Sequence, residues 1–354
     1  MAAATLSELI DIATSSEGLD ATNARKAAEL LVLAEVPAQE KADLLKAMNL
    51  RGETPVELAA FAGTFREKVR DPGLDDLAER SIDIVGTGGD KSGSFNISTT
   101  SAFVVAAAGV PVLKHGNRSI TSKCGSADLL SAAGVDIEAD LPTLRRSAQE
   151  LNFAFFFAPA FHPAFKEIVP VRKALAEQGH RTIFNLLGPL INPAKPAYQL
   201  LGVYPSHWVG AIAQALEAVG LKSGMVVHSV LGEDRGMDEW STAGSNLGAG
   251  VGELASHQWN EDNPFPLAEL DLEPCDFDEL KGGDLNQNLN LLQRLMDGKA
   301  PKGLEDTVSL NAGAALWIAG RCGSLKDGVV AAREVLTGGA LQRWRTQLKE
   351  FYAG

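Results

Sequence analysis

Apolar positions in the first 70 residues recur with the spacing of three to four residues that is typical of helices. Residues 6–13, 24–33 and 39–48 each carry such a stripe, and Thr5 followed by Glu8 has the form of a capping box. After a break, residues 54–57 restart the pattern with a threonine N-cap and a proline at the first helical position. We expect this part to be helical and to pack or dimerise rather than to carry chemistry.

The pattern changes at residue 82, where β-branched residues predict a short strand over 82–85. This strand ends in GTGGD (86–90), and NIST (96–99) then opens an apolar helix that stops at Gly109. The next strand is expected at 111–113, with KHGNR (114–118) just beyond its carboxyl end. Glycines allow close backbone approach, a helix N-terminus favours anions, and ligands of open α/β sheets bind at carboxyl strand ends. We therefore predict a phosphate-rich ligand between these two strand ends.

Two common phosphate motifs do not fit this turn. A dinucleotide fingerprint that starts at Gly86 requires glycine at position 91, which is Lys91, and a P-loop requires lysine directly after glycine, whereas Asp90 intervenes. For GTGGD alone, a strand-to-helix turn without a ligand is an equal alternative, because short glycine motifs often occur by chance. The NIST and KHGNRS segments argue against that alternative.

The rest of the chain alternates strands and helices. Residues 126–133 predict a helix, for which Ser126 is an N-cap candidate, and the apolar run 153–157 predicts a buried strand. Residues 200–204, 208–219 and 225–230 form a strand–helix–strand pattern, after which a loop at 231–237 leads to Asp238 and Glu239. Residues 244–266 predict loops with short strands, and 308–318 and 325–336 predict helices that pack on the sheet.

Composition restricts the function classes. A length of 354 residues favours about two domains, and 45% hydrophobic with 22% charged residues is ordinary for a globular protein. The net charge of −13 argues against nonspecific nucleic-acid binding, and the most apolar stretch is too short to cross a bilayer. Three widely spaced cysteines indicate neither a disulfide framework nor a zinc site, so we expect a cytoplasmic protein.

Several blocks resemble the signature segments of the anthranilate phosphoribosyltransferase family. They are GTGGD, NIST, residues 114–122, residues 124–128, His162-Pro163, Arg172, RTIFNLLGPLINP (181–193) and Asp238-Glu239, and they occur in family order over nearly the whole chain. The resemblance implies a small all-helical domain and a larger α/β domain with a central, mostly parallel sheet flanked by helices. The helical domain would comprise residues 1–72 with 170–195 returning to it, and the α/β domain residues 78–168 and 196–354. A homodimer formed through the helical domain is also implied.

The resemblance further implies transfer of a phosphoribosyl group from phosphoribosyl pyrophosphate to the amine of anthranilate in tryptophan biosynthesis. Magnesium would be held by Ser98, Asp238 and Glu239, although an acidic pair in a loop is on its own more often solvent-exposed. Arg172 would bind the anthranilate carboxylate as a bidentate fork, with Gly86 and Asn117 beside it. Phosphoribosyl pyrophosphate would contact Gly86, Gly89, Asp90, Ser94, Asn96, Ile97, Ser98, Thr99, Lys114, His115, Gly116, Asn117, Arg118, Ser119, Ser122 and Ser126. No residue is assigned as a general base, and His115 can equally be a packed, hydrogen-bonded histidine.

Two other functions stay open. A pyrimidine nucleoside phosphorylase shares the architecture but uses inorganic phosphate, and a non-enzymatic paralogue of the fold would bind nucleic acid through a basic surface. Three departures from the family pattern bear on the acceptor: a long segment at 176–180, an extended loop at 229–235, and Trp240 with the glycine-rich stretch after it.

Overall fold

The computed structural model describes residues 5–118 and 124–353. Within this part, eight strands form one sheet in the order β3-β2-β1-β4-β5-β7-β8, with β6 paired to the end of β5. The neighbours from β3 to β5 are parallel, and β6, β7 and β8 are antiparallel. The strands are β1 (Ile82–Gly86), β2 (Val112–Gly116), β3 (Phe153–Phe157), β4 (Tyr198–Gly202), β5 (Ser223–Gly232), β6 (Arg235–Met237), β7 (Ser245–Gly252) and β8 (Gln258–Trp259). The expected fold class is therefore confirmed.

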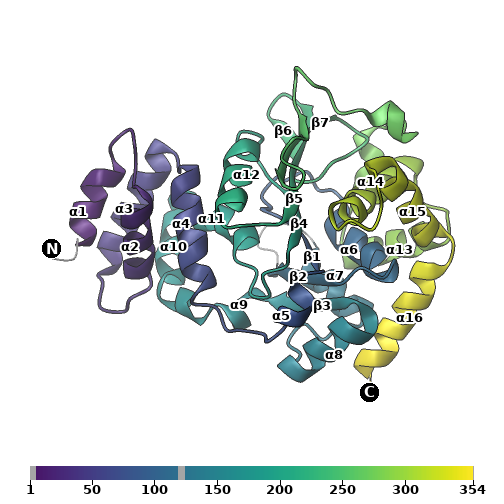
Figure 1. The fold of residues 1–354 in the computed structure, drawn as a ribbon, viewed down its shortest axis with the longest axis horizontal. Helices are drawn as coiled ribbons and strands as arrows, with labels where there is room; N and C mark the ends of the chain where they lie inside the picture. Colours follow the sequence, from purple (N-terminus) through teal and green to yellow (C-terminus); the bar gives the residue numbers. More distant parts are fainter. Residues whose placement is uncertain (1–4, 119–123, 354) are drawn as a thin grey trace.

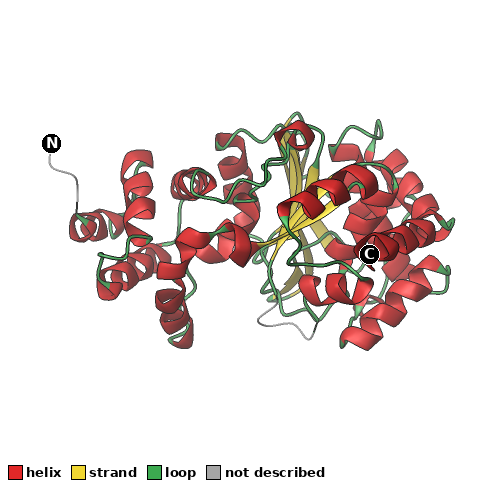
Figure 2. Ribbon diagram, turned by 90° about the horizontal axis from the view of Figure 1, so that it is seen from below, coloured by secondary structure: helices red, strands yellow, loops and turns green. Residues whose placement is uncertain are grey.

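Helices lie on both faces of this sheet and extend well beyond it on one side (Figures 1 and 2). Those of the N-terminal part are α1 (Leu6–Ala13), α2 (Ala21–Leu31), α3 (Ala38–Arg51) and α4 (Pro55–Arg66). The short helix α5 (Asp75–Ala78) precedes β1. Between the strands come α6 (Ile97–Ala107), α7 (Ser126–Ala133), α8 (Leu141–Leu151), α9 (Ala158–Phe161), α10 (Val169–Glu177), α11 (Phe184–Leu187) and α12 (Trp208–Ala218). The chain ends in α13 (Leu285–Met296), α14 (Lys302–Ile318), α15 (Leu325–Thr337) and α16 (Ala340–Ala353). None of the described helices is both long and apolar enough to cross a membrane.

The N-terminal helices form as the sequence predicts. Thr5 and Glu8 make a reciprocal capping box at α1, and Thr54 and Glu57 make a second one at α4, where each glutamate accepts from the threonine N–H. Such caps satisfy amide groups that a helix start leaves unpaired. We call α1–α4 together with α10 and α11 the helical unit, because their apolar side chains belong to one buried cluster.

This cluster continues onto one face of the sheet. It includes α12 and residues of β4 and β5, so the helical unit shares its core with the α/β part. A second cluster, on the opposite face, joins α6 and α13–α16 to β1, β2 and β3. Two side-chain amides pin the segment after α11: Asn192 donates to Asp83 on β1 (2.8 Å), and Gln199 on β4 donates to the carbonyl of Pro189 (2.7 Å). The exact domain boundaries at 72, 78, 170 and 195 stay a prediction.

Four local expectations were wrong. Lys114 and His115 lie inside β2 rather than beyond it, because the strand runs on to Gly116 in register with β3. The loop expected at 231–237 is a hairpin, since β5 extends to Gly232 and β6 folds back on it. Ser126 is the first residue of α7 and Gly125 is its N-cap. The stretch 245–252 is a full strand rather than a loop with short strands.

Glycines in β7 have a packing reason that also explains Trp240. A Cβ atom at Gly248 would lie 2.9 Å from the Trp240 ring, and one at Gly250 would overlap the carbonyl of Leu254. Trp240 itself is completely buried, and its indole N–H donates to the carbonyl of Leu247 (2.7 Å). Glycine in a strand often marks such a close approach. Trp240 and the glycines after it are therefore parts of one packed core.

Candidate active site

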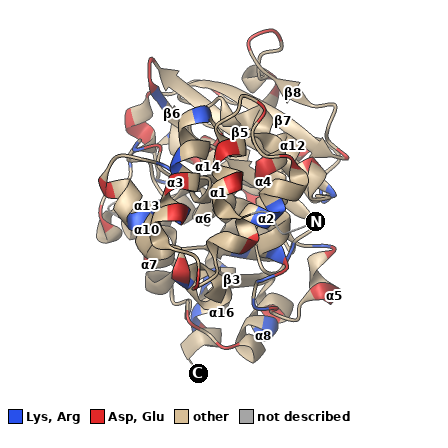
Figure 3. Ribbon diagram, turned by 90° about the vertical axis from the view of Figure 1, so that its left-hand side faces the viewer, with Lys and Arg blue, Asp and Glu red and all other residues tan. Residues whose placement is uncertain are grey.

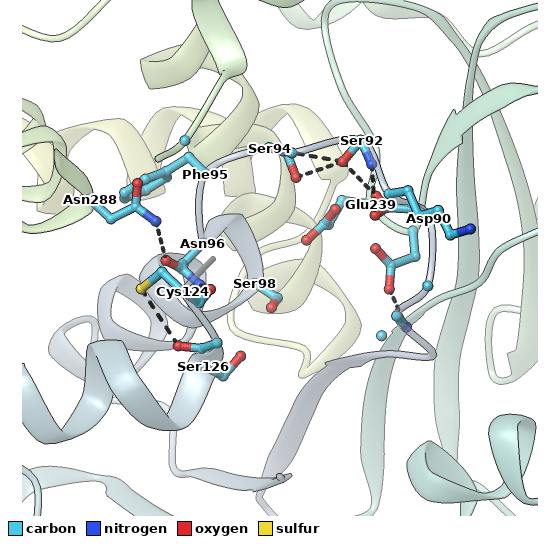
Figure 4. Close-up of a pocket in the computed structure, with 18 of the residues that line it drawn as sticks. Asp90, Ser92, Ser94, Phe95, Asn96, Ser98, Cys124, Ser126, Glu239 and Asn288 are labelled. Carbon is cyan, nitrogen blue, oxygen red and sulfur yellow. Dashed lines mark hydrogen bonds between the residues drawn. The ribbon is translucent and has the colours of Figure 1, made fainter. Parts of the chain in front are cut away.

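One pocket of about 440 Å³ lies at the carboxyl ends of β1 and β2. It is lined by the turn after β1, the start of α6, Asn117 after β2, the start of α7, the acidic pair after β6, and the loop before α13 with Asn288. Ser98 and Ser126 lie at the two helix starts, on the other side of the pocket from Asp90 and Glu239 (Figure 4). The pocket thus joins segments that are up to about 200 residues apart in the chain, as parallel strand ends do in open α/β sheets.

The turn after β1 depends on glycine for its backbone shape. Gly88, Gly89 and Gly93 have φ angles of 67°, 81° and 74°, in the left-handed region where residues with a Cβ are strained. Asp90 closes the turn on itself: its carboxylate accepts from the amide (3.1 Å) and the hydroxyl (2.8 Å) of Ser92. The glycines and the contacts of Asp90 with Ser92 thus fix the shape of the turn beside the pocket.

Two further glycines make room for Asp238. Gly86 and Gly202 are paired in register at the ends of β1 and β4. A Cβ at Gly86 would overlap the carboxylate of Asp238, and one at Gly202 would overlap its backbone carbonyl. The carboxylate instead accepts a hydrogen bond from the amide of Gly88 (2.7 Å). The absence of side chains at two strand ends therefore fixes where the acidic pair sits.

Three carboxylates converge in the pocket. Asp90, Asp238 and Glu239 each present an oxygen within 4.8 Å of the others. Burial and then the neighbouring Asp90 raise the pKa of Asp238, and burial and then Asp238 raise the pKa of Glu239 well above its usual range. The Oε2 atom of Glu239 is buried and has no hydrogen-bond partner among the described residues. Carboxylates held this close are stabilised by taking up a proton or by binding a cation between them.

Asparagine side chains form the opposite wall. The amide of Asn96 donates to the carbonyl of Cys124 (3.1 Å), and Asn288 on α13 donates to Asn96 (2.8 Å). Asn288 also accepts from the amide of Gly283 (2.7 Å), which holds the loop 282–283 against the pocket. Sequence reasoning missed Asn288, Gly282 and Gly283, because a single asparagine in an amphipathic helix carries no motif.

Comparison with known proteins decides the family. The sequence profile of the Glycosyl transferase family, a/b domain, matches residues 78–342. An anthranilate phosphoribosyltransferase of Thermus thermophilus is 44% identical over 323 residues, which is 91% of this chain and 92% of that protein. One from Brucella suis biovar 1 is 39% identical over 339 residues and covers 95% of both chains. The chain belongs to the anthranilate phosphoribosyltransferase family.

Solved structures agree with the fold. The crystal structure of anthranilate phosphoribosyltransferase from Thermus thermophilus superposes with a TM-score of 0.85 at 41% identity, covering 98% of this chain and 99% of that one. The enzyme from Saccharomyces cerevisiae in complex with PRPP and Mg has a TM-score of 0.82 at 22% identity, covering 98% of each chain, and at that identity it speaks for the fold alone.

Most residues that the family resemblance singles out face the pocket. Its lining contains Gly86, Gly89, Asp90, Ser94, Asn96, Ser98, Asn117, Ser126, Asp238 and Glu239. Ile97 and Thr99 do not line it, because their side chains are buried under the start of α6. Gly116 packs against the ring of Phe155, and Arg118 lies 3.7 Å from Asp128 rather than in the pocket. Ser119 and Ser122 lie outside the described residues.

Lys114 lies beneath the pocket instead of lining it. It is buried, and its ammonium group donates to the carbonyl of Ile84 in β1. Burial lowers the pKa of Lys114, while the charges of Asp83, Glu239 and Asp238 act in the opposite direction. Because the lysine side chain projects from within β2, its charge faces the acidic pair from the sheet side.

His115 is a packed histidine in the family's KHGN block. Its Nδ1 lies 3.1 Å from the carbonyl of Gly188, and its Nε2 lies 3.0 Å from Nε2 of His162. A carbonyl only accepts, so Nδ1 carries the proton and Nε2 of the neutral ring accepts from His162. Burial and then His162 lower the pKa of His115 to about 3. Both ring nitrogens of His115 are therefore engaged in contacts within the protein.

Arg172 lies on α10, apart from the pocket lining. Its guanidinium carbon is 5.0 Å from the ring centre of Phe184, a cation–π geometry, and burial lowers the pKa of Arg172. Among the described residues, no hydrogen bond or ion pair engages the guanidinium. The ordinary surface salt bridge that is the simplest alternative for this arginine is therefore absent from the described part.

Proposed function

We propose that this protein transfers the 5-phosphoribosyl group of phosphoribosyl pyrophosphate to the amine of anthranilate, giving N-(5-phosphoribosyl)anthranilate and pyrophosphate in tryptophan biosynthesis. The carrying observation is that the glycine turn, the start of α6 and three carboxylates face a single pocket. Such a site offers amide donors for phosphate on one side and ligands for a divalent cation on the other.

Magnesium fits the donor set of the pocket. Asp90, Asp238 and Glu239 supply hard carboxylate oxygens, and Glu239 has a buried oxygen without a partner among the described residues. Asp90, which the sequence placed with the phosphate ligands, joins this set. Ser98 on the opposite wall is the proposed contact for a second ion on the pyrophosphate side. When bound, magnesium neutralises the negative charge of the pyrophosphate.

The protein would act mainly by holding the two substrates in line. The bond between C1 of the ribose and the pyrophosphate oxygen breaks, a bond from the amine nitrogen to C1 forms, and the nitrogen releases one proton. Amide groups of the glycine turn and of the α6 start would hold the phosphates, and the neutral aromatic amine needs no prior deprotonation. Positioning and electrostatic stabilisation of the leaving group then carry the catalysis.

The acceptor site is proposed to include Arg172 and Asn117, with Gly86 beside them. Asn117 already lines the pocket. The guanidinium of Arg172 makes no hydrogen bond or ion pair with a described residue, which supports a role in binding the anthranilate carboxylate. Arg172 sits on the helical unit, so acceptor binding would depend on how that unit lies against the sheet. The planar fork of arginine matches a carboxylate better than an ammonium group does.

A fluorescence assay tests this function. Incubation with phosphoribosyl pyrophosphate, magnesium and anthranilate should remove anthranilate fluorescence, and omission of either magnesium or the phosphoribosyl donor should stop the loss. Thymidine with inorganic phosphate tests the phosphorylase alternative, and a mobility shift at physiological salt tests nucleic-acid binding. The nucleic-acid-binding alternative requires a basic surface, whereas acidic and basic positions are interspersed on the helices that face the viewer in Figure 3. Thymidine cleavage without anthranilate turnover would overturn the proposal.

Three further expectations belong to the same proposal. The homodimer through the helical unit, the cytoplasmic location and the domain boundaries rest on the family resemblance and on the sequence. The dimer is checked by sedimentation, where a monomer at micromolar concentration would count against it.

A further inference from the structure

The charge of the pocket does not suit a polyanionic ligand. Among the described residues that line it, Asp90, Asp238 and Glu239 are acidic, and Lys91 is the single cation. Lys91 lies in the exposed turn with a φ angle of 54°. Magnesium bound at the carboxylates would neutralise the negative charge of the ligand at one end of the pocket. At the other end, the glycine turn offers amide groups but little positive charge. A cation is therefore expected close to this turn.

Arg181 lies at that position. A Cβ atom built on Gly89 would be 2.9 Å from Nη2 of Arg181 and 3.8 Å from its Cζ, so the guanidinium rests against the glycine turn. Gly89 has a φ angle of 81° and no side chain to keep the arginine away. Arg181 is exposed, and among the described residues it makes no hydrogen bond or ion pair. A guanidinium placed on a phosphate-binding turn with its donors free has the chemistry to bind phosphate.

Arg181 lies between α10 and α11 of the helical unit. The residues after it, Ile183 and Phe184, are buried in the cluster of the helical unit. The charge of Arg181 also acts on Glu53, a buried carboxyl just before α4, whose pKa is raised chiefly by burial and lowered in part by Arg181. The arginine therefore extends from the helical unit to a turn of the α/β part, close to an acidic group that attracts it.

We propose that Arg181 is a binding and positioning residue for the phosphate groups of phosphoribosyl pyrophosphate. This inference rests on the proposed function and adds a contact from the helical unit to the phosphate side of the substrate. Arg172 would bind anthranilate, the acceptor, and Arg181 would bind phosphoribosyl pyrophosphate, the donor. Two arginines of one segment, 172–181, would therefore each bind a different substrate. Donor binding would then draw the helical unit and the glycine turn together.

The test compares Arg181→Ala and Arg181→Lys with Lys173→Ala. Lys173 is an exposed cation on α10 in the same segment and serves as the matched control for loss of one charge. Calorimetry with phosphoribosyl pyrophosphate and magnesium, without anthranilate, measures donor affinity directly, and steady-state kinetics measures both Michaelis constants. Thermal melting confirms that each variant is folded.

Arg181→Ala should weaken donor binding about tenfold, the lower end for a charge-assisted contact at an exposed site. Arg181→Lys should recover part of that loss, the Michaelis constant for anthranilate should stay within about twofold, and added salt should shrink the difference from wild type. Unchanged donor affinity in both variants, or an effect confined to anthranilate, would overturn the inference. A wild-type protein that does not bind the donor would instead overturn the proposed function.

Discussion

Replacing Gly202 by alanine tests whether the acidic pair is positioned by the absence of a side chain. Gly202 is buried at the end of β4 and does not line the pocket, so the substitution acts on the site only through its neighbour. The new Cβ would overlap the carbonyl oxygen of Asp238 and lie 3.2 Å from its Cα. The closest contact is with the carbonyl oxygen, 1.4 Å from the new Cβ. Non-bonded atoms in proteins prefer separations of about 3.5–4.0 Å, so the carbonyl of Asp238 must move by roughly 2 Å or its peptide must rotate.

The expected magnitude follows from the contact that this movement breaks. The carboxylate of Asp238 accepts from the amide of Gly88 at 2.7 Å, and a shift of about 1 Å takes this pair outside hydrogen-bond range. A hydrogen bond to a charged group contributes about 1.5–3 kcal/mol, which corresponds to roughly 10- to 150-fold in affinity for the bound cation. Overpacking should also lower the free energy of unfolding by about 1–3 kcal/mol.

The assay is the magnesium dependence of the initial rate at saturating concentrations of both substrates. Gly202→Ala should need at least about tenfold more magnesium for half-maximal rate, and excess magnesium should recover part of the activity. Gly210→Ala is the control, because Gly210 lies on the exposed side of α12 with open space at its Cβ position. A folded Gly202→Ala protein with the magnesium dependence of wild type would refute the reasoning.

Three other results are expected. Asp238→Asn combined with Glu239→Gln should leave the melting temperature near that of wild type and abolish turnover at ordinary magnesium concentrations. If the double variant keeps its activity, the acidic pair does not hold the catalytic magnesium. Arg172→Ala should raise the Michaelis constant for anthranilate by roughly one to two orders of magnitude and leave that for phosphoribosyl pyrophosphate nearly unchanged, with incomplete rescue by lysine. Burial lowers the pKa of His162 to about 4. The contribution of His162 to the free energy of unfolding is therefore fully present above pH 6.5 and is lost as the pH falls. Urea unfolding should show a loss of about 2 kcal/mol from this histidine between pH 7 and pH 5, and His162→Gln should remove that part of the pH dependence.

Sequence reasoning predicted the elements whose signals are local. The capping boxes at α1 and α4, the strand at Ile82–Gly86 and the helix that follows it all depend on residues adjacent in the chain. Residues 244–266 were expected to contain only short strands, whereas β7 is eight residues long. Its glycines make room for Trp240 and for the carbonyl of Leu254, neither of which a local pattern contains. Its tertiary packing overrides the low strand propensity of glycine.

In the candidate site, too, residues that belong to local motifs were predicted, whereas residues placed by tertiary contacts were not. The blocks around Gly86 and Asp238 carry motifs, and the structure brings both to one pocket. Lys114 was placed beyond the strand end because the apolar run that predicted the strand stops at Leu113, yet β2 extends past Lys114 and buries it. Asn288 belongs to none of the quoted motifs, and Arg181 was noted only as the first residue of the block 181–193, without a role. Each makes its contact with a segment more than 90 residues away.

Because the helical unit shares its core with the sheet, its N-terminal helices cannot complete their packing until later parts of the chain have been synthesised. Helices α1–α4 are made first, but part of the apolar surface they cover is supplied by α10–α12 and β5, roughly 100–160 residues later. At about 5–20 residues per second, this delay lasts roughly 5–30 s. During that interval Phe65 of α4 lacks two of its packing partners, because its ring contacts those of Phe165 and Phe184 in the folded protein, where it is almost fully buried. A nascent chain stalled near residue 150 would therefore present an apolar surface to chaperones or to other nascent chains.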